Sequence, residues 1–88
     1  MINAKEFVGG LLEGRYDDWC MSVYYCEYGM QEMVEFFGKE WELHGWAKPD
    51  TYYLICHLDT GQTPPPDLDT DFTAHSEKGN TCHIYELQ

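Results

Sequence analysis

The stretch that decides the fold runs from Met30 to Trp46 and reads MQEMVEFFGKEWELHGW. Its apolar residues recur at the i, i+3, i+4, i+7 and i+11 positions of one helical face: Met30, Met33, Val34, Phe37 and Trp41. Carboxylates occupy another face, so the stretch is predicted to form one amphipathic helix that stops at Gly45. One side of this helix would build the core, and the other would present acids to solvent.

The remaining segments predict a small sheet and a second helix. A short helix is expected after Asn3, whose side chain can cap it. Strands are expected over residues 20–28 and over Tyr52–Leu58, and the second should be central because both of its faces are apolar. A turn signal at residues 77–80 predicts a hairpin of Phe72–Ser76 and Thr81–Leu87, whereas the proline-rich residues 59–71 form a loop.

This order of elements predicts one α+β domain over residues 1–88. Two helices would pack on one face of a mostly antiparallel sheet of three to four strands. A chain of this length has room for a single hydrophobic core.

Acidic residues dominate the charge balance, with 16 Asp and Glu against 5 Lys and Arg and a net charge of −11. Contact with nucleic acid or an anionic membrane requires clustered basic residues, so neither is an expected partner. An acidic domain instead attracts basic proteins, although the charge could also serve solubility alone. No segment has the length of a membrane span or the apolar core of a signal peptide, so a cytoplasmic protein is expected.

The four cysteines, Cys20, Cys26, Cys56 and Cys82, are expected to be reduced and buried. A zinc-stabilised domain that uses these cysteines and neighbouring histidines is the alternative. Adjacent residues on a strand point to opposite faces, so each Cys-His pair can offer one ligand to a site. The chain has no C-x₂-C motif, no phosphate-binding glycine loop and no nucleophile elbow, so we expect no metal, no cofactor and no catalysis.

Carboxylates three or four residues apart on a helix lie roughly 5–6 Å from each other. Successive phosphates of a nucleic-acid strand have a broadly similar spacing, so a row of acids can imitate them in a basic channel. Loop acids and the exposed aromatic residues at the ends of the predicted helix would extend this surface. The candidate partner-binding residues are Glu32, Glu35, Glu40, Glu42, Asp17, Asp18, Trp46 and Tyr28.

Residues Gly10 to Asp18 read GLLEGRYDD and have the form G-x-L-x-G-R-[aromatic]-x-D. This segment resembles the opening motif of ArdA-type antirestriction proteins, which are acidic DNA mimics and carry Trp where Tyr16 stands. In size and composition the chain is also similar to phage anti-CRISPR inhibitors. The resemblance implies an inhibitor that blocks the basic nucleic-acid channel of a bacterial defence system, and it agrees with the charge.

Overall fold

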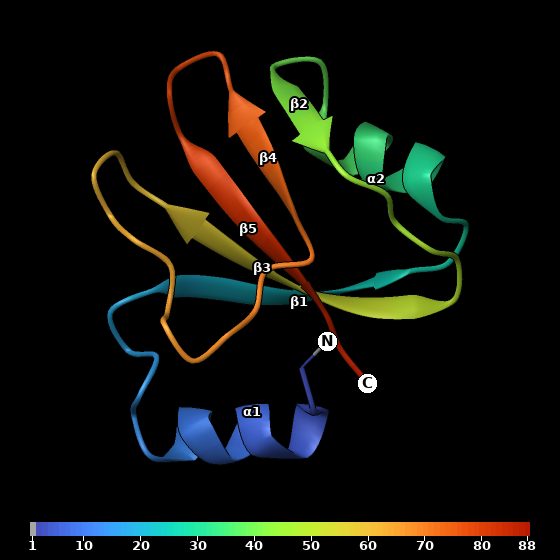
Figure 1. Ribbon diagram of the computed structural model, residues 1–88. Helices are drawn as coiled ribbons and strands as arrows, with labels where there is room; N and C mark the ends of the chain where they lie inside the picture. The colour runs from blue at the N-terminus through green and yellow to red at the C-terminus, as the bar shows by residue number, and fades with distance from the viewer. Residues whose placement is uncertain (1) are drawn as a thin grey trace.

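The computed structural model describes residues 2–88, which form two helices and a single five-stranded sheet (Figure 1). The helices are α1 (Ala4–Leu12) and α2 (Met30–Phe37), and the strands are β1 (Cys20–Cys26), β2 (Trp41–His44), β3 (Thr51–Leu58), β4 (Phe72–Ser76) and β5 (Thr81–Glu86). The strand order is β1-β3-β5-β4-β2, and every neighbouring pair is antiparallel. The α+β prediction is confirmed, with five strands in place of three to four.

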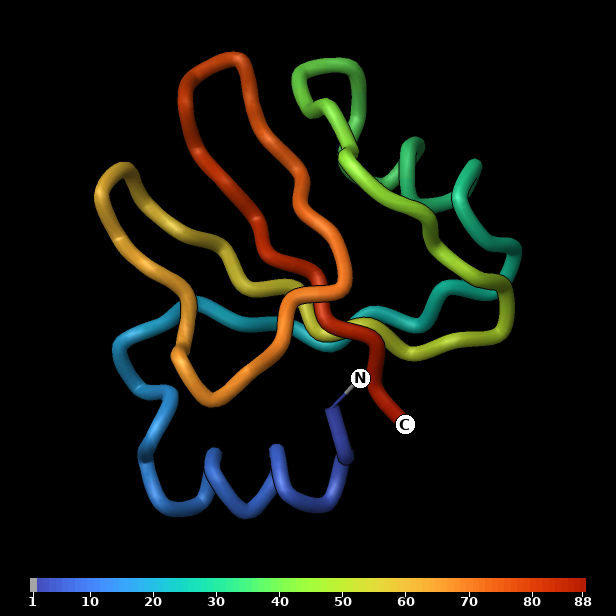
Figure 2. Tube along the Cα trace, viewed as in Figure 1, coloured from blue at the N-terminus to red at the C-terminus, as the bar shows by residue number. Residues whose placement is uncertain are grey.

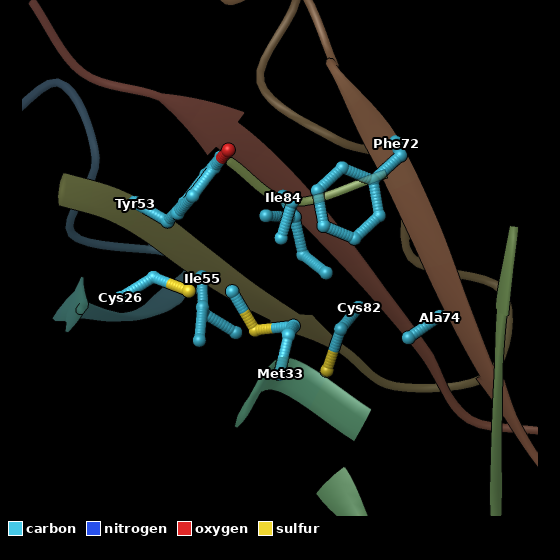
Figure 3. Close-up of a cluster of buried hydrophobic side chains, with 9 residues drawn as sticks. Cys26, Met33, Tyr53, Ile55, Phe72, Ala74, Cys82 and Ile84 are labelled. Atoms are coloured by element: carbon cyan, nitrogen blue, oxygen red, sulfur yellow. The ribbon is translucent and has the colours of Figure 1, made fainter. Parts of the chain in front are cut away.

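The two helices cover opposite faces of the sheet, so the prediction that they share one face was wrong. Met33 of α2 packs against Ile55 and Ile84 on one face (Figure 3). Phe7 of α1 packs against Leu54 and its neighbours on the other face. Side chains alternate across a strand, and β3 is apolar on both sides, so each face has to be covered separately.

The long helix predicted over Met30–Trp46 ends at Phe37, which is a second correction. Gly38 adopts φ 88° and ψ −179°, a conformation that essentially only glycine tolerates, and it stops the helix. The chain then enters β2, where Trp41 and Leu43 pack towards the α2 side of the sheet. The strand alternation of the four residues of β2 therefore prevails over the helical spacing, which Trp41 also fits.

The elements outside this stretch agree closely with their predictions. The Asn3 side chain caps α1 by accepting hydrogen bonds from the backbone N–H groups of Lys5 (2.9 Å) and Glu6 (3.4 Å). The predicted hairpin is formed by β4 and β5. Both ends of the described chain lie together (Figure 2), because Ile2 donates its N–H to the carbonyl of Glu86 at 2.9 Å. No helix among residues 2–88 is long and apolar enough to cross a membrane.

Candidate protein-binding surface

The connection between α1 and β1 holds the long 59–71 loop through two side chains of the Gly10–Asp18 motif. The Tyr16 hydroxyl donates a 2.9 Å hydrogen bond to Asp67, and the Arg15 guanidinium lies 3.6 Å from the same carboxylate. Burial, followed by the hydrogen bond to Asp67, raises the pKa of Tyr16, which therefore remains a donor at neutral pH. Gly10 makes room for this ring, because a Cβ there would lie 2.5 Å from Tyr16 Cε2.

Two more hydrogen bonds fix the other half of the same loop. The indole N–H of Trp19 donates to the carbonyl of Thr63 at 2.9 Å, and the Gln62 amide donates to the carbonyl of Asp18 at 2.9 Å. The Gln62 side chain also accepts from the backbone N–H of Asp59 at 3.3 Å. The loop is therefore fastened at several points to the segment that leads into β1.

This fastening brings together three parts of the sequence that carry acidic residues. Glu6 and Asp69 line a cavity of about 550 Å³ together with Arg15 and Asp67, and Glu13 lies 3.1 Å from the guanidinium of Arg15. We use the name α1 acidic surface for seven exposed acids of α1, of the α1–β1 connection and of the 59–71 loop: Glu6, Glu13, Asp17, Asp18, Asp59, Asp67 and Asp69. The predicted residues Asp17 and Asp18 belong to it and are exposed.

The predicted residue Glu32 has a structural role in addition to its charge. Its carboxylate accepts hydrogen bonds from the backbone N–H groups of Glu27 (2.9 Å) and Tyr28 (2.8 Å) and from the hydroxyl of Tyr24. Glu32 is the third residue of α2 and so closes the turn that precedes this helix. The hydroxyl of Tyr24 and then these N–H groups lower the pKa of Glu32, while burial and this hydrogen bond raise the pKa of Tyr24 to about 12.

The other three predicted glutamates do not form a row on one helix. Glu35 is exposed on α2, Glu40 lies in the turn after it, and Glu42 lies on β2. The carbonyl of Glu40 accepts from the N–H of Glu77 at 3.0 Å, and the Glu42 carboxylate is 3.8 Å from His44. Figure 1 places β2 at the end of the molecule away from α1, so these acids are separate from the α1 acidic surface.

The predicted aromatic anchors lie on two loops that pack against each other. Trp46 is 72% exposed and Tyr28 is 77% exposed. The N–H of Asp50 donates to the carbonyl of Glu27 at 3.1 Å, which joins the loop that carries Tyr28 to the loop that follows Trp46. Both aromatic side chains are therefore available to a partner on a fixed backbone.

A second aromatic pair was missed by the sequence analysis. The rings of Tyr25 and Tyr52 contact each other at a tilt of 42°, with their centroids 4.7 Å apart on neighbouring strands, and the Tyr25 hydroxyl donates to Asp50. Each strand carries two consecutive tyrosines, which was the available signal. Which of the tyrosines meet depends on a register that the sequence does not reveal.

The four cysteines are not brought together, so the structure does not gather the alternative zinc ligands. Cys20 and Cys26 lie at opposite ends of β1, about 20 Å apart at the usual strand rise. Cys56 faces the α1 side of the sheet, whereas Cys26 and Cys82 face the α2 side. Among residues 2–88, no group of three Cys, His, Asp or Glu side chains is arranged to hold a metal ion.

The expectation of buried cysteines holds for three of them, while Cys20 is exposed. Burial raises the pKa of Cys56 to about 11 and that of Cys82 to about 12, so both remain thiols at neutral pH. The Cys82 sulfur lies 3.1 Å from Nδ1 of His57, close enough for the thiol to donate to the ring. This geometry describes a structural cysteine and gives no support for a nucleophile.

No protein-family model matches the chain, and no curated protein or solved structure is significantly similar to it.

Proposed function

We propose that this chain is a protein-binding inhibitor whose α1 acidic surface occupies a basic, nucleic-acid-binding surface of another protein. The observation that carries the proposal is the fastening of the 59–71 loop to the α1–β1 connection. Hydrogen bonds from Tyr16, Trp19 and Gln62 hold this loop in one place. A net charge of −11 opposes direct nucleic-acid binding and favours a basic partner.

Rigid placement matters because binding then costs little conformational entropy. A flexible acidic tail loses chain freedom when it docks, whereas carboxylates on a fastened loop are already in position. The attraction between these carboxylates and a basic channel is also screened by salt. We therefore expect the affinity to fall steeply as the salt concentration rises.

The class of partner follows from the Gly10–Asp18 segment, which resembles an antirestriction motif. Within this segment Arg15 and Tyr16 hold Asp67, and Gly10 accommodates the Tyr16 ring. The segment therefore builds the α1 acidic surface. We propose a cytoplasmic partner among bacterial defence systems of the restriction or CRISPR type, with Tyr28 and Trp46 as additional aromatic contacts.

The experiment compares two charge reversals that change the net charge equally. One variant carries Asp17→Lys, Asp18→Lys and Asp59→Lys in the α1 acidic surface. The control carries Glu35→Lys, Glu40→Lys and Glu77→Lys, at exposed acids that lie outside this surface. Inhibition of DNA binding by purified restriction and CRISPR effector complexes is followed by fluorescence anisotropy at low and high salt.

We expect the first variant to lose inhibition by at least tenfold and the control to stay within about twofold of the wild type. Equal losses in both variants would show that only total charge matters. No inhibition of any of these complexes by the wild-type protein would refute the proposed partner class.

A further inference from the structure

β1 is an edge strand with an unprotected outer side. It pairs with β3 along all seven of its residues, and among residues 2–88 no other strand pairs with it. Its sequence, CMSVYYC, contains no charged residue and no proline. Edge strands usually carry a charge, a proline or a bulge that prevents further pairing, so the outer N–H and C=O groups of β1 are open to another strand.

The opposite edge of the same sheet shows the usual protection. β2 has only four residues, and it carries Glu42 and His44, whose exposed side chains point to the side of the sheet opposite to that of Trp41 and Leu43. One sheet therefore has a short, charged edge and a long, uncharged one. In a chain in which 24% of the residues are charged, this difference identifies β1 as the edge that is suited to pairing.

The side chains beside the open edge are suited to an apolar neighbour. On the α1 side of the sheet, Val23 is 58% exposed and lies next to the tilted ring pair of Tyr25 and Tyr52. On the other side, Cys20 and Ser22 are exposed and small. A strand added here would place alternate side chains against Val23 and Tyr25, which gives both backbone and side-chain contacts.

Charges at the two ends of β1 decide between possible occupants. Asp17 and Asp18 precede the strand, and Glu27 follows it beside Asp50. A second copy, paired antiparallel about Val23, would bring the Asp17–Asp18 end of one chain to the Glu27 end of the other. The repulsion at both ends opposes such a dimer, whereas a strand with basic ends is attracted.

We propose that β1 accepts an extended segment of a partner protein as a sixth strand, and that this segment is uncharged in its centre and carries Lys or Arg at both ends. The inference rests on the proposed function, because it names the element of a basic partner that is engaged. It adds backbone pairing, which confers a defined register, to the charge attraction of the α1 acidic surface.

The probe is a synthetic peptide of alternating valine and threonine residues with two lysines at each end. Its binding to the wild-type chain is compared with binding to Val23→Lys and to the matched control Val34→Lys. Val34 is exposed on α2, so the control has the same substitution and net charge away from the β1 edge. We expect at least tenfold weaker binding for Val23→Lys and less than a twofold change for Val34→Lys.

Amide hydrogen exchange of the wild-type protein provides a second measurement that needs no variant. Alternate N–H groups within residues 20–26 point away from β3, and these should become protected when the peptide is bound. Protection with this two-residue period supports strand addition.

Results that contradict strand addition can be distinguished from results that contradict the proposed function. Equal binding to both variants without protection in β1 would overturn strand addition, whereas inhibition by the α1 acidic surface could still stand. Absence of peptide binding would also overturn it. Protection of β1 without peptide, in a protein that sediments as a dimer, would assign the edge to a second copy instead.

Discussion

Two adjacent glycines in α1 are predicted to respond in opposite ways to the same substitution. Both Gly9 and Gly10 lie inside the helix, where alanine is preferred by about 0.5–1 kcal/mol. A Cβ at Gly9 would meet no atom within 4 Å. A Cβ at Gly10 would lie 2.5 Å from Cε2 of Tyr16, far inside van der Waals contact.

The Tyr16 ring cannot easily move away from this methyl group. The ring is 5% exposed, stacks on Phe7 with centroids 5.3 Å apart, and is held by its hydroxyl to Asp67. Overpacking of this kind costs about 1–3 kcal/mol, which exceeds the helical gain. Gly9→Ala should therefore stabilise the protein by about 0.5–1 kcal/mol, and Gly10→Ala should destabilise it by up to about 2 kcal/mol.

Urea unfolding followed by tryptophan fluorescence measures both effects, and thermal unfolding provides a check. For a domain of this size a change of 1 kcal/mol corresponds to about 4–8 °C in Tm. Equal stabilisation by Gly9→Ala and Gly10→Ala would refute the reasoning, because it would mean that Tyr16 is not fixed against α1. The attachment of the 59–71 loop would then need another explanation.

Three further predictions concern titratable groups. Cys20 should be the one thiol that reacts rapidly with Ellman's reagent in the folded protein, because the other cysteines are buried, and Cys20→Ser should remove the fast phase. Lys48→Met should lower the urea midpoint, because the buried Glu86 carboxylate, 3.2 Å from the Lys48 ammonium, would lose its cation. Folding lowers the pKa of Glu32, so its stabilising contribution is present at neutral pH and is lost as the pH falls through the folded-state pKa. Glu32→Gln should therefore flatten the fall in stability at acidic pH, below the ordinary pKa of a glutamate.

Matched controls exist for these substitutions. Lys39→Met and Glu35→Gln repeat two of them at exposed positions for which no ion pair or side-chain hydrogen bond is present among residues 2–88. Both controls should leave the urea midpoint nearly unchanged. Rapid modification of more than one thiol in the folded protein would contradict the burial of Cys26, Cys56 and Cys82.

Local signals in the sequence were sufficient for most of the secondary structure. The Asn3 cap, the strand over residues 51–58 and the hairpin at residues 77–80 depend on residues close in the chain, and all three are present. The prediction that the helix continues beyond Phe37 was wrong, because the helical and the strand periodicity overlap in the residues that follow. Trp41 satisfies the helical spacing and also the strand alternation, and Gly38 decided between them.

The candidate surface was harder to predict because its members meet only through tertiary contacts. Asp17 and Asp18 were identified from charge, but the Gln62 side chain connects their segment to Asp59 by donating to the Asp18 carbonyl and accepting from the Asp59 N–H, which leaves no pattern in the sequence. Glu32 was identified as a surface acid although it closes the turn before α2. A carboxylate at the third position of a helix was the signal that could have indicated this role.

The strand order has a consequence for how the protein is made. β1 and β2 come from the first half of the chain, but they lie at opposite edges of the sheet, with β3, β5 and β4 between them. β5 is synthesised after the other four strands of this sheet, and it pairs with both β3 and β4. Before β5 has left the ribosome, β1 with β3 and β2 with β4 are therefore two strand pairs with no strand hydrogen-bonded between them. Acquisition of the fold has to wait for β5, and a nascent chain stalled before it offers the open edges of β3 and β4 to chaperones and proteases.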